Sequence, residues 1–189
     1  MYYYLSQQNL NPNFIGSWII NPISICDDLI SYFESNKDKQ QKGKISGGEN
    51  LDVKNSIDIG ILPKDLELPC NAVFKAYFNS LFSCYRDYTT QWPFLTQIVK
   101  NVQIGIFNLQ RYQSGQHFQS THTERSSLDN LHRIFAWMTY LNDVENDSNG
   151  WTYLTLYNLK IPLRIGFKFL EISSLSTPWS KHSSKCSDI

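Results

Sequence analysis

His122 and Glu124 are the residues whose types and spacing could do chemistry. They are separated only by Thr123. On an extended strand, residues two apart project from the same face, so the imidazole and the carboxylate would lie side by side. Such a pair can occupy two adjacent sites on one metal ion. Two histidines and one carboxylate that leave open coordination positions are typical of non-haem iron(II) sites that react with dioxygen. The pair by itself is equally compatible with a surface ion pair.

The residues before this pair extend the pattern. The segment runs Gln110-Arg111-Tyr112-Gln113-Ser114-Gly115-Gln116-His117-Phe118. It resembles the sequence Arg-Tyr-x-x-Gly-x-x-Phe/Tyr-x-x-His-x-Asp/Glu of prolyl 4-hydroxylase-like enzymes, which are iron(II)/2-oxoglutarate-dependent oxygenases. Glu124 stands where Asp is commoner in that family.

The resemblance continues on both sides. Arg133 to Tyr140-Leu141-Asn142 is similar to the family's Arg-x-x-x-x-x-x-Tyr-Leu-Asn strand. Two later segments resemble its Gly-Gly-x-Thr and Pro-x-x-Gly turns, namely Asn149-Gly150-Trp151-Thr152 and Pro162 to Gly166. Upstream, Phe14-Ile15-Gly16-Ser17-Trp18 through Lys54-Asn55-Ser56-Ile57-Asp58 resembles a subgroup that uses His-Thr-Glu. The resemblance covers about residues 14–166 and is strongest over 110–141.

This resemblance implies a site. His122 and Glu124 would bind Fe(2+), 2-oxoglutarate would be the co-substrate, and ascorbate would serve as reductant. Tyr140 would donate its hydroxyl to the distal carboxylate of 2-oxoglutarate, and Tyr112 would lie near the metal-bound end. A phenol suits this role because it is an apolar body with one polar tip. The alternative for both tyrosines is ordinary cross-strand core, and Arg133 and Asn142 would hold the scaffold.

The other histidines fit the pattern less well. His117 is five residues before His122, and odd spacing on a strand places it on the opposite face. His132 is also interpreted as lying outside the site. The family pattern requires a second histidine ligand on a late strand, and counting from Gly166 reaches Thr177 instead.

The C-terminal part after about residue 167 therefore departs from the family. His182 is the only later histidine, and it lies in a polar C-terminal segment that is interpreted as a frayed tail. Lys181 and Lys185 are the basic residues available to pair with the distal carboxylate of 2-oxoglutarate. A shift of reading frame after about Phe167 is one hypothesis for this departure, and truncation is another. Reading the nucleotide sequence in the next frame tests the first.

An α+β fold is expected to position these residues. Apolar spacing predicts a helix from Pro22 to about Ser35, and a second, aromatic-rich helix over Asn71–Tyr88 that backs a sheet. The lysine-rich segment 36–48 is interpreted as a solvated mobile loop rather than a phosphate-binding patch. Short strands are predicted at Phe14–Ile20, Val53–Leu62, Val102–Arg111, Phe118–His122, Arg133–Leu141, Trp151–Leu156, Ile161–Ile165 and Phe167–Ile172. Helices first and strands later favour a double-stranded β-helix, or jelly roll, with N-terminal flanking helices.

Length and composition limit the domain organisation, the binding partners and the location that can be expected. The 189 residues suit a single domain, with 14–100 as N-terminal support, 101–172 as jelly-roll strands and 173–189 as an irregular tail. A formal net charge of zero gives no electrostatic case for nucleic acid or anionic membrane. Without a signal peptide or a long apolar run, the chain is expected in the cytoplasm, and its cysteines are read as reduced thiols: Cys26, Cys70, Cys84 and Cys186.

These observations leave three functional hypotheses. The first is a dioxygenase that hydroxylates a peptidyl or small-molecule substrate. The second is a binding or structural module of the same fold that has lost catalysis, which the altered C-terminus favours. The third is a cupin-like hydrolase or isomerase that uses zinc or manganese without 2-oxoglutarate.

Overall fold

The computed structural model describes residues 14–120, 122–125, 127–143, 151–154, 159–162, 166–172 and 179–180. Three α-helices fall in this part of the chain: α1 (Ser24–Ser35), α2 (Val73–Gln91) and the short α3 (Phe94–Ile98). Strands in its first half are β1 (Ile15–Ile19), β2 (Gln41–Lys42), β3 (Lys54–Asn55), β4 (Ile57–Ile61), β5 (Phe107–Arg111) and β6 (His117–Phe118). The later strands are β7 (Phe135–Thr139), β8 (Trp151–Leu154), β9 (Leu159–Pro162), β10 (Phe167–Ile172) and β11 (Trp179–Ser180).

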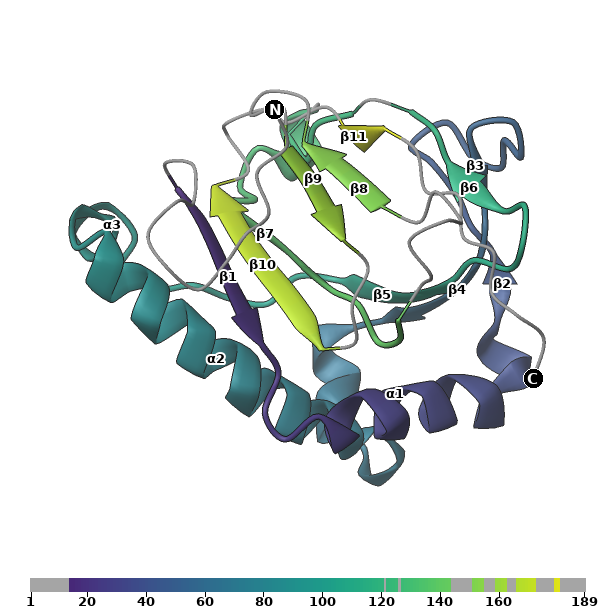
Figure 1. Ribbon diagram of the computed structural model, residues 1–189, viewed down its shortest axis with the longest axis horizontal. Coiled ribbons are helices and arrows are strands. Elements are labelled where there is room, and N and C mark those ends of the chain that lie inside the picture. The colour runs from purple at the N-terminus through teal and green to yellow at the C-terminus, as the bar shows by residue number, and fades with distance from the viewer. Residues whose placement is uncertain are drawn as a thin grey trace.

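The strands pair into small antiparallel sheets. Their orders are β1-β10-β7, β11-β8-β9, β2-β4-β5 and β3-β6. Figure 1 shows α1 and α2 along one side of the strands, with the β8–β9 hairpin at the far side from the two helices. The described chain is therefore a mixed helix and sheet protein with helices on one side, as the sequence pattern predicts.

The main core lies between α1, α2 and the β4–β5 pair. Helical spacing gives each helix one apolar face, and Ile59, Ile61 and Leu109 meet these faces from the sheet. The buried helical residues in this cluster are Ile25, Cys26, Leu29, Tyr32, Phe33, Phe74 and Tyr77. The prediction that α2 backs a sheet is confirmed, although Phe82 is 59 % exposed rather than part of the buried face.

Several strand boundaries differ from those predicted. Pairing in β5 begins only at Phe107, because its partner β4 ends at Ile61 and leaves 102–106 without a ladder. A strand over Phe118–His122 was wrong, since β6 ends at Phe118 and residues 119, 120 and 122 lie outside any strand. The lysine-rich segment is also more ordered than a loop, because Gln41–Lys42 forms β2 against β4.

Gly166 fixes the start of β10. Its φ of 71° is in the left-handed region that glycine adopts readily. Its N–H donates to the Tyr140 carbonyl at 2.8 Å, and its carbonyl accepts from the Ile20 N–H at 2.7 Å. A Cβ here would also lie 2.6 Å from Cγ2 of the buried Ile20, so the packing favours glycine as well. This turn ties Tyr140 at the end of β7 to the segment after β1.

In the part of the chain that is described, no helix is long and apolar enough to cross a membrane. Cys26, Cys70 and Cys84 are free thiols. The placement in the cytoplasm stays a prediction. Cys186, Asn149, Gly150, Thr177, Lys181, His182 and Lys185 lie outside the described residues.

Candidate metal and co-substrate site

One face of the β4–β5 pair carries polar side chains. Because successive side chains alternate, Ile59 and Leu109 point to the helices while Asp58 and Gln110, which are register partners, point the other way. Tyr112 follows Gln110 by two residues, and its hydroxyl donates to Gln110 Oε1 at 3.0 Å. The polar face of this strand pair therefore lies on the side away from the helices.

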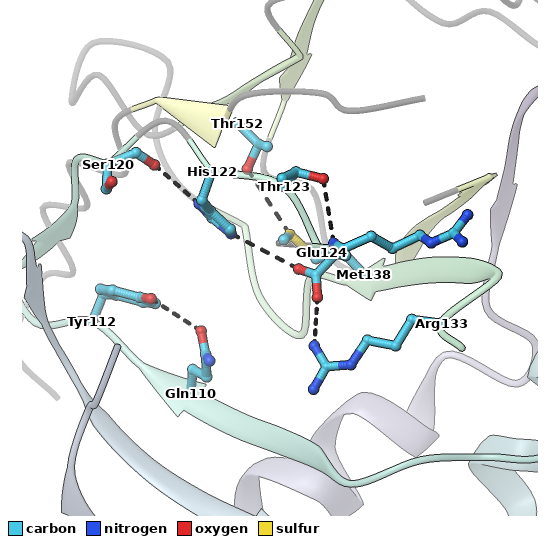
Figure 2. A network of polar contacts seen from close by, with 10 residues as sticks. Gln110, Tyr112, Ser120, His122, Thr123, Glu124, Arg133, Met138 and Thr152 are labelled. Atoms are coloured by element: carbon cyan, nitrogen blue, oxygen red, sulfur yellow. Dashed lines mark hydrogen bonds and ion pairs between the residues drawn. The ribbon is translucent and has the colours of Figure 1, made fainter. Parts of the chain in front are cut away.

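His122 and Glu124 are brought together, although not on a strand. His122 Nε2 lies 3.8 Å from Glu124 Oε1, and both side chains are about 30 % exposed. Figure 2 shows the imidazole and the carboxylate pointing toward each other. Their adjacency was predicted on the assumption of an extended strand, but in the structure these residues lie in irregular backbone.

The His122 ring has a defined orientation. Its Nδ1 lies 3.0 Å from the Ser120 carbonyl, and since a carbonyl only accepts, Nδ1 carries the hydrogen. In the neutral ring this tautomer leaves the Nε2 lone pair on the side of Glu124. The Phe118 ring stacks on the imidazole, with centroids 4.5 Å apart and planes at 27°.

Arg133 holds the other end of the carboxylate. Its guanidinium donates to Glu124 Oε2 at 2.8 Å (Figure 2). One carboxylate oxygen is therefore paired with Arg133, and Oε1 faces the histidine. Arg133 was expected to support the scaffold, and in the structure it contacts a predicted ligand directly.

This donor set fits a divalent cation. A neutral imidazole nitrogen and a carboxylate oxygen are ligands that iron accepts, and a hydrogen bond on Nδ1 is the usual way to orient a ligating histidine. Two ligand atoms about 2.1 Å from one metal lie about 3.0–3.4 Å apart at octahedral to tetrahedral angles. The observed 3.8 Å needs a contraction of about half an ångström to reach this range.

A third ligand is not found among the described residues, where no group of three His, Cys, Asp or Glu could hold a metal. His182, the candidate from the sequence, lies outside them. His117 is directed elsewhere, with Nε2 3.2 Å from the Asp52 carbonyl.

Tyr140 and Tyr112 are protonated hydrogen-bond donors. Burial raises the pKa of Tyr140 well above its usual value, partly offset by a short hydrogen bond from its hydroxyl to Thr152 Oγ1, and the proximity of Tyr112 raises it further. Burial and the Asp58 carboxylate also raise the pKa of Tyr112, while a hydrogen bond with Ser56 lowers it. Both phenols therefore keep their hydrogen at neutral pH and can donate it to an anion.

Sequence reasoning missed the polar residues around Tyr112 and Tyr140. Lys54, Ser56 and Asp58 form one buried group, and Thr152 meets both the Tyr140 hydroxyl and, at 3.9 Å, Met138 Sδ. The alternation of Ser56 and Asp58 with isoleucines signals a polar face on β4. The contacts of Thr152 depend on how β7 and β8 pack, which the sequence does not display.

Comparison with solved structures identifies the fold. The described geometry resembles a prolyl-4-hydroxylase from Pseudomonas putida, with a TM-score of 0.65 and 13 % identity over 91 % of this chain and 86 % of that one. A prolyl hydroxylase from Trichoplax adhaerens, solved with a hypoxia inducible factor oxygen degradation domain peptide fragment, gives 0.66 and 16 % identity over 93 % and 79 %. The viral collagen prolyl hydroxylase of Paramecium Bursaria Chlorella virus-1 gives 0.63 and 13 % over 92 % and 91 %.

No protein-family model and no curated protein sequence matches the chain. The structural likeness spans more than nine-tenths of this chain at low identity, so it shows that this chain shares the fold of prolyl hydroxylases. It agrees with the family that the motifs around His122 resemble.

Proposed function

We propose that this chain is a single-domain iron(II)- and 2-oxoglutarate-dependent dioxygenase, with its small sheets arranged as a double-stranded β-helix. The observation that carries the proposal is the His122–Glu124 pair, with Nε2 and Oε1 facing each other at 3.8 Å in a fold shared with prolyl hydroxylases.

Each residue has a role in this proposal. His122 Nε2 and Glu124 Oε1 would hold the metal, and Arg133 would keep Glu124 in one orientation through Oε2. The Tyr140 hydroxyl would turn from Thr152 Oγ1, to which it donates in this structure, and donate instead to the distal carboxylate of 2-oxoglutarate. Tyr112 would lie toward the metal-bound end. When bound, iron and 2-oxoglutarate would supply oxidative decarboxylation coupled to hydroxylation of the substrate.

The substrate is proposed to be a peptide or, failing that, a small molecule. A peptide is preferred because the Trichoplax prolyl hydroxylase of the same fold was solved with a peptide fragment. Substrate contacts commonly lie on variable loops, so the peptide's sequence is not specified by the fold.

Succinate formation tests the proposal. The chain is incubated with Fe(II), 2-oxoglutarate and ascorbate, with and without proline-containing peptides, and succinate is quantified. His122→Ala should lower the rate by about 100-fold or more, because loss of a ligand costs at least as much as loss of a residue that orients one. The matched control is His132→Ala at an exposed histidine, which should leave the rate unchanged.

Three results would count against this function. Equal rates for the parent and His122→Ala would show that His122 is not a ligand. Absence of succinate under all conditions would favour the catalytically impaired module, and turnover independent of 2-oxoglutarate would favour a different metal enzyme.

A further inference from the structure

We propose that Phe118 is a positioning residue that holds the His122 imidazole for metal binding, and that the buried Lys54–Asp58 ion pair fixes Phe118 in turn. The inference rests on the proposed function, since it assigns these residues a role toward His122 as a ligand. It extends the site from the pair itself to the β3–β6 ladder and to β4.

The first step is the contact between Phe118 and His122. The hydrogen bond from Nδ1 to the Ser120 carbonyl fixes one atom of the imidazole, but the ring can still pivot about that atom. The Phe118 ring, stacked at 4.5 Å, fixes the plane as well. With both constraints the Nε2 atom is held toward Glu124, which reduces the conformational freedom that metal binding would otherwise remove.

The second step is what holds Phe118. It is the cross-strand partner of Lys54 in the β3–β6 ladder, and the next residue, Gln119, donates its N–H to the Val53 carbonyl at 2.8 Å. The Lys54 ammonium lies over the Phe118 ring at 5.6 Å from the centroid, within range of a cation–π attraction. The ring is therefore constrained by backbone pairing and by a charged side chain.

The third step is what holds Lys54. Its side chain is buried, and Nζ donates to Asp58 Oδ2 at 2.6 Å. Ser56 Oγ donates to Asp58 Oδ1 at 2.7 Å, so both carboxylate oxygens are occupied. The backbone of Gly43 covers this group closely, because a Cβ there would lie 2.1 Å from Ser56 Oγ.

The Lys54–Asp58 pair is suited to set geometry rather than to attract an anion. The ammonium is already neutralised by a carboxylate, so the pair adds little net charge beside the metal ligands. Breaking a buried pair is costly, which makes its arrangement rigid. The same group lies beside Tyr112, because the Asp58 carboxylate is close enough to raise the pKa of that phenol.

Metal affinity of Phe118 variants tests this inference. Mn(II) is used as a redox-stable probe, and its binding to the full chain is measured by electron paramagnetic resonance. Phe118→Leu keeps an apolar side chain but cannot stack, and should weaken Mn(II) binding about tenfold, the cost typical of residues that orient a ligand. Phe118→Tyr keeps the ring and should bind Mn(II) like the parent. Phe82→Leu is the matched control, because Phe82 is exposed on α2.

A second measurement separates positioning from stability. The Co(II) absorption spectrum reports ligand geometry, and should change in Phe118→Leu but not in Phe118→Tyr, while the thermal midpoints of both are compared with the parent. The double variant Lys54→Met/Asp58→Asn removes the ion pair without leaving one buried charge alone, and should weaken Mn(II) binding in the same direction. It supplies the test if Phe118→Leu does not fold.

The outcomes distinguish this inference from the proposed function. If Phe118→Leu and the double variant both bind Mn(II) like the parent while His122→Ala does not, the positioning role is wrong and the metal site stands. If the parent itself does not bind Mn(II), with or without 2-oxoglutarate, the proposed function fails and the positioning role fails with it.

Discussion

Tyr140 is held in the fold by its side chain and, separately, by its backbone. Its side chain is buried at the end of β7, and its hydroxyl donates to Thr152 Oγ1. Its backbone carbonyl accepts from Gly166 at 2.8 Å, so its position is set independently of the hydroxyl. A change confined to the hydroxyl therefore leaves this backbone contact in place.

Tyr140→Phe is predicted to raise the KM for 2-oxoglutarate about tenfold, because a hydrogen bond to a charged group contributes about 1.5–3 kcal/mol. Mn(II) binding should not change, since the hydroxyl is not a proposed metal ligand. Both quantities are measured on the purified chain, with Tyr85→Phe on α2 as control. A Tyr140→Phe variant with the parental KM would place the hydroxyl outside the co-substrate site.

At the residue scale, the sequence predicted those parts of the site that are local. His122 and Glu124 are two residues apart, so their adjacency follows from the chain itself. The contacts of Lys54 with Phe118, and of Tyr140 with Thr152, depend on sheet register and packing. The burial of Lys54 was missed because a lysine followed by asparagine and serine gives no sign of a charged pair inside the protein.

At the scale of elements, α2 is joined to β7 by a polar contact within an apolar core. The Tyr77 hydroxyl lies 2.9 Å from Thr139 Oγ1 and accepts from Trp137 Nε1 at 3.0 Å. Aromatic spacing predicted the helix and its buried face, because that signal is periodic along one segment. The strand ends were less accurate, since a strand such as β5 extends only where its partner does.

Tyr77→Phe is predicted to lower the free energy of unfolding by about 1–3 kcal/mol at pH 7, because it leaves the Trp137 indole N–H without its acceptor. Urea unfolding measures this loss. Thr139→Val removes one partner and keeps the indole bond, so its effect should be smaller. Equal losses in the two variants would contradict this assignment.

The same residue predicts a dependence on pH. Burial raises the pKa of Tyr77 from 10.0 to about 12. Between these values the unfolded chain releases the phenolic proton and the folded chain retains it, so stability falls as pH rises above about 10. Tyr77→Phe should lose less stability than the parent over this interval, as measured by urea unfolding at each pH. A parallel decline in both would show that Tyr77 does not contribute.

At the scale of the whole molecule, strand β10 joins parts that are distant in sequence. It lies between β1 and β7, and Lys168 on it reaches α2, where Nζ donates to Ser80 Oγ at 2.8 Å. Lys168 is 1 % exposed, and its ammonium lies over the Tyr77 ring. Among the described residues, no carboxylate forms an ion pair with it. Sequence alternation predicted β10 correctly, but not that its lysine would be enclosed beneath the helices.

This enclosed amine makes the stability of the molecule depend on pH in the opposite sense to Tyr77. Burial lowers the pKa of Lys168 below 10.5, so as pH rises toward that value the folded chain gives up the proton before the unfolded chain does, and stability rises. Lys168→Met should be at least as stable as the parent at pH 7. Its stability should not rise with pH in this way, so the difference in unfolding free energy between the two proteins should narrow toward pH 10. Chemical unfolding at several pH values measures the effect, with Lys42→Met on the exposed strand β2 as control. Lys168→Met could instead be less stable than the parent at every pH, with the same change of unfolding free energy per pH unit. That result would show that Ser80 and the Tyr77 ring stabilise a charged ammonium here.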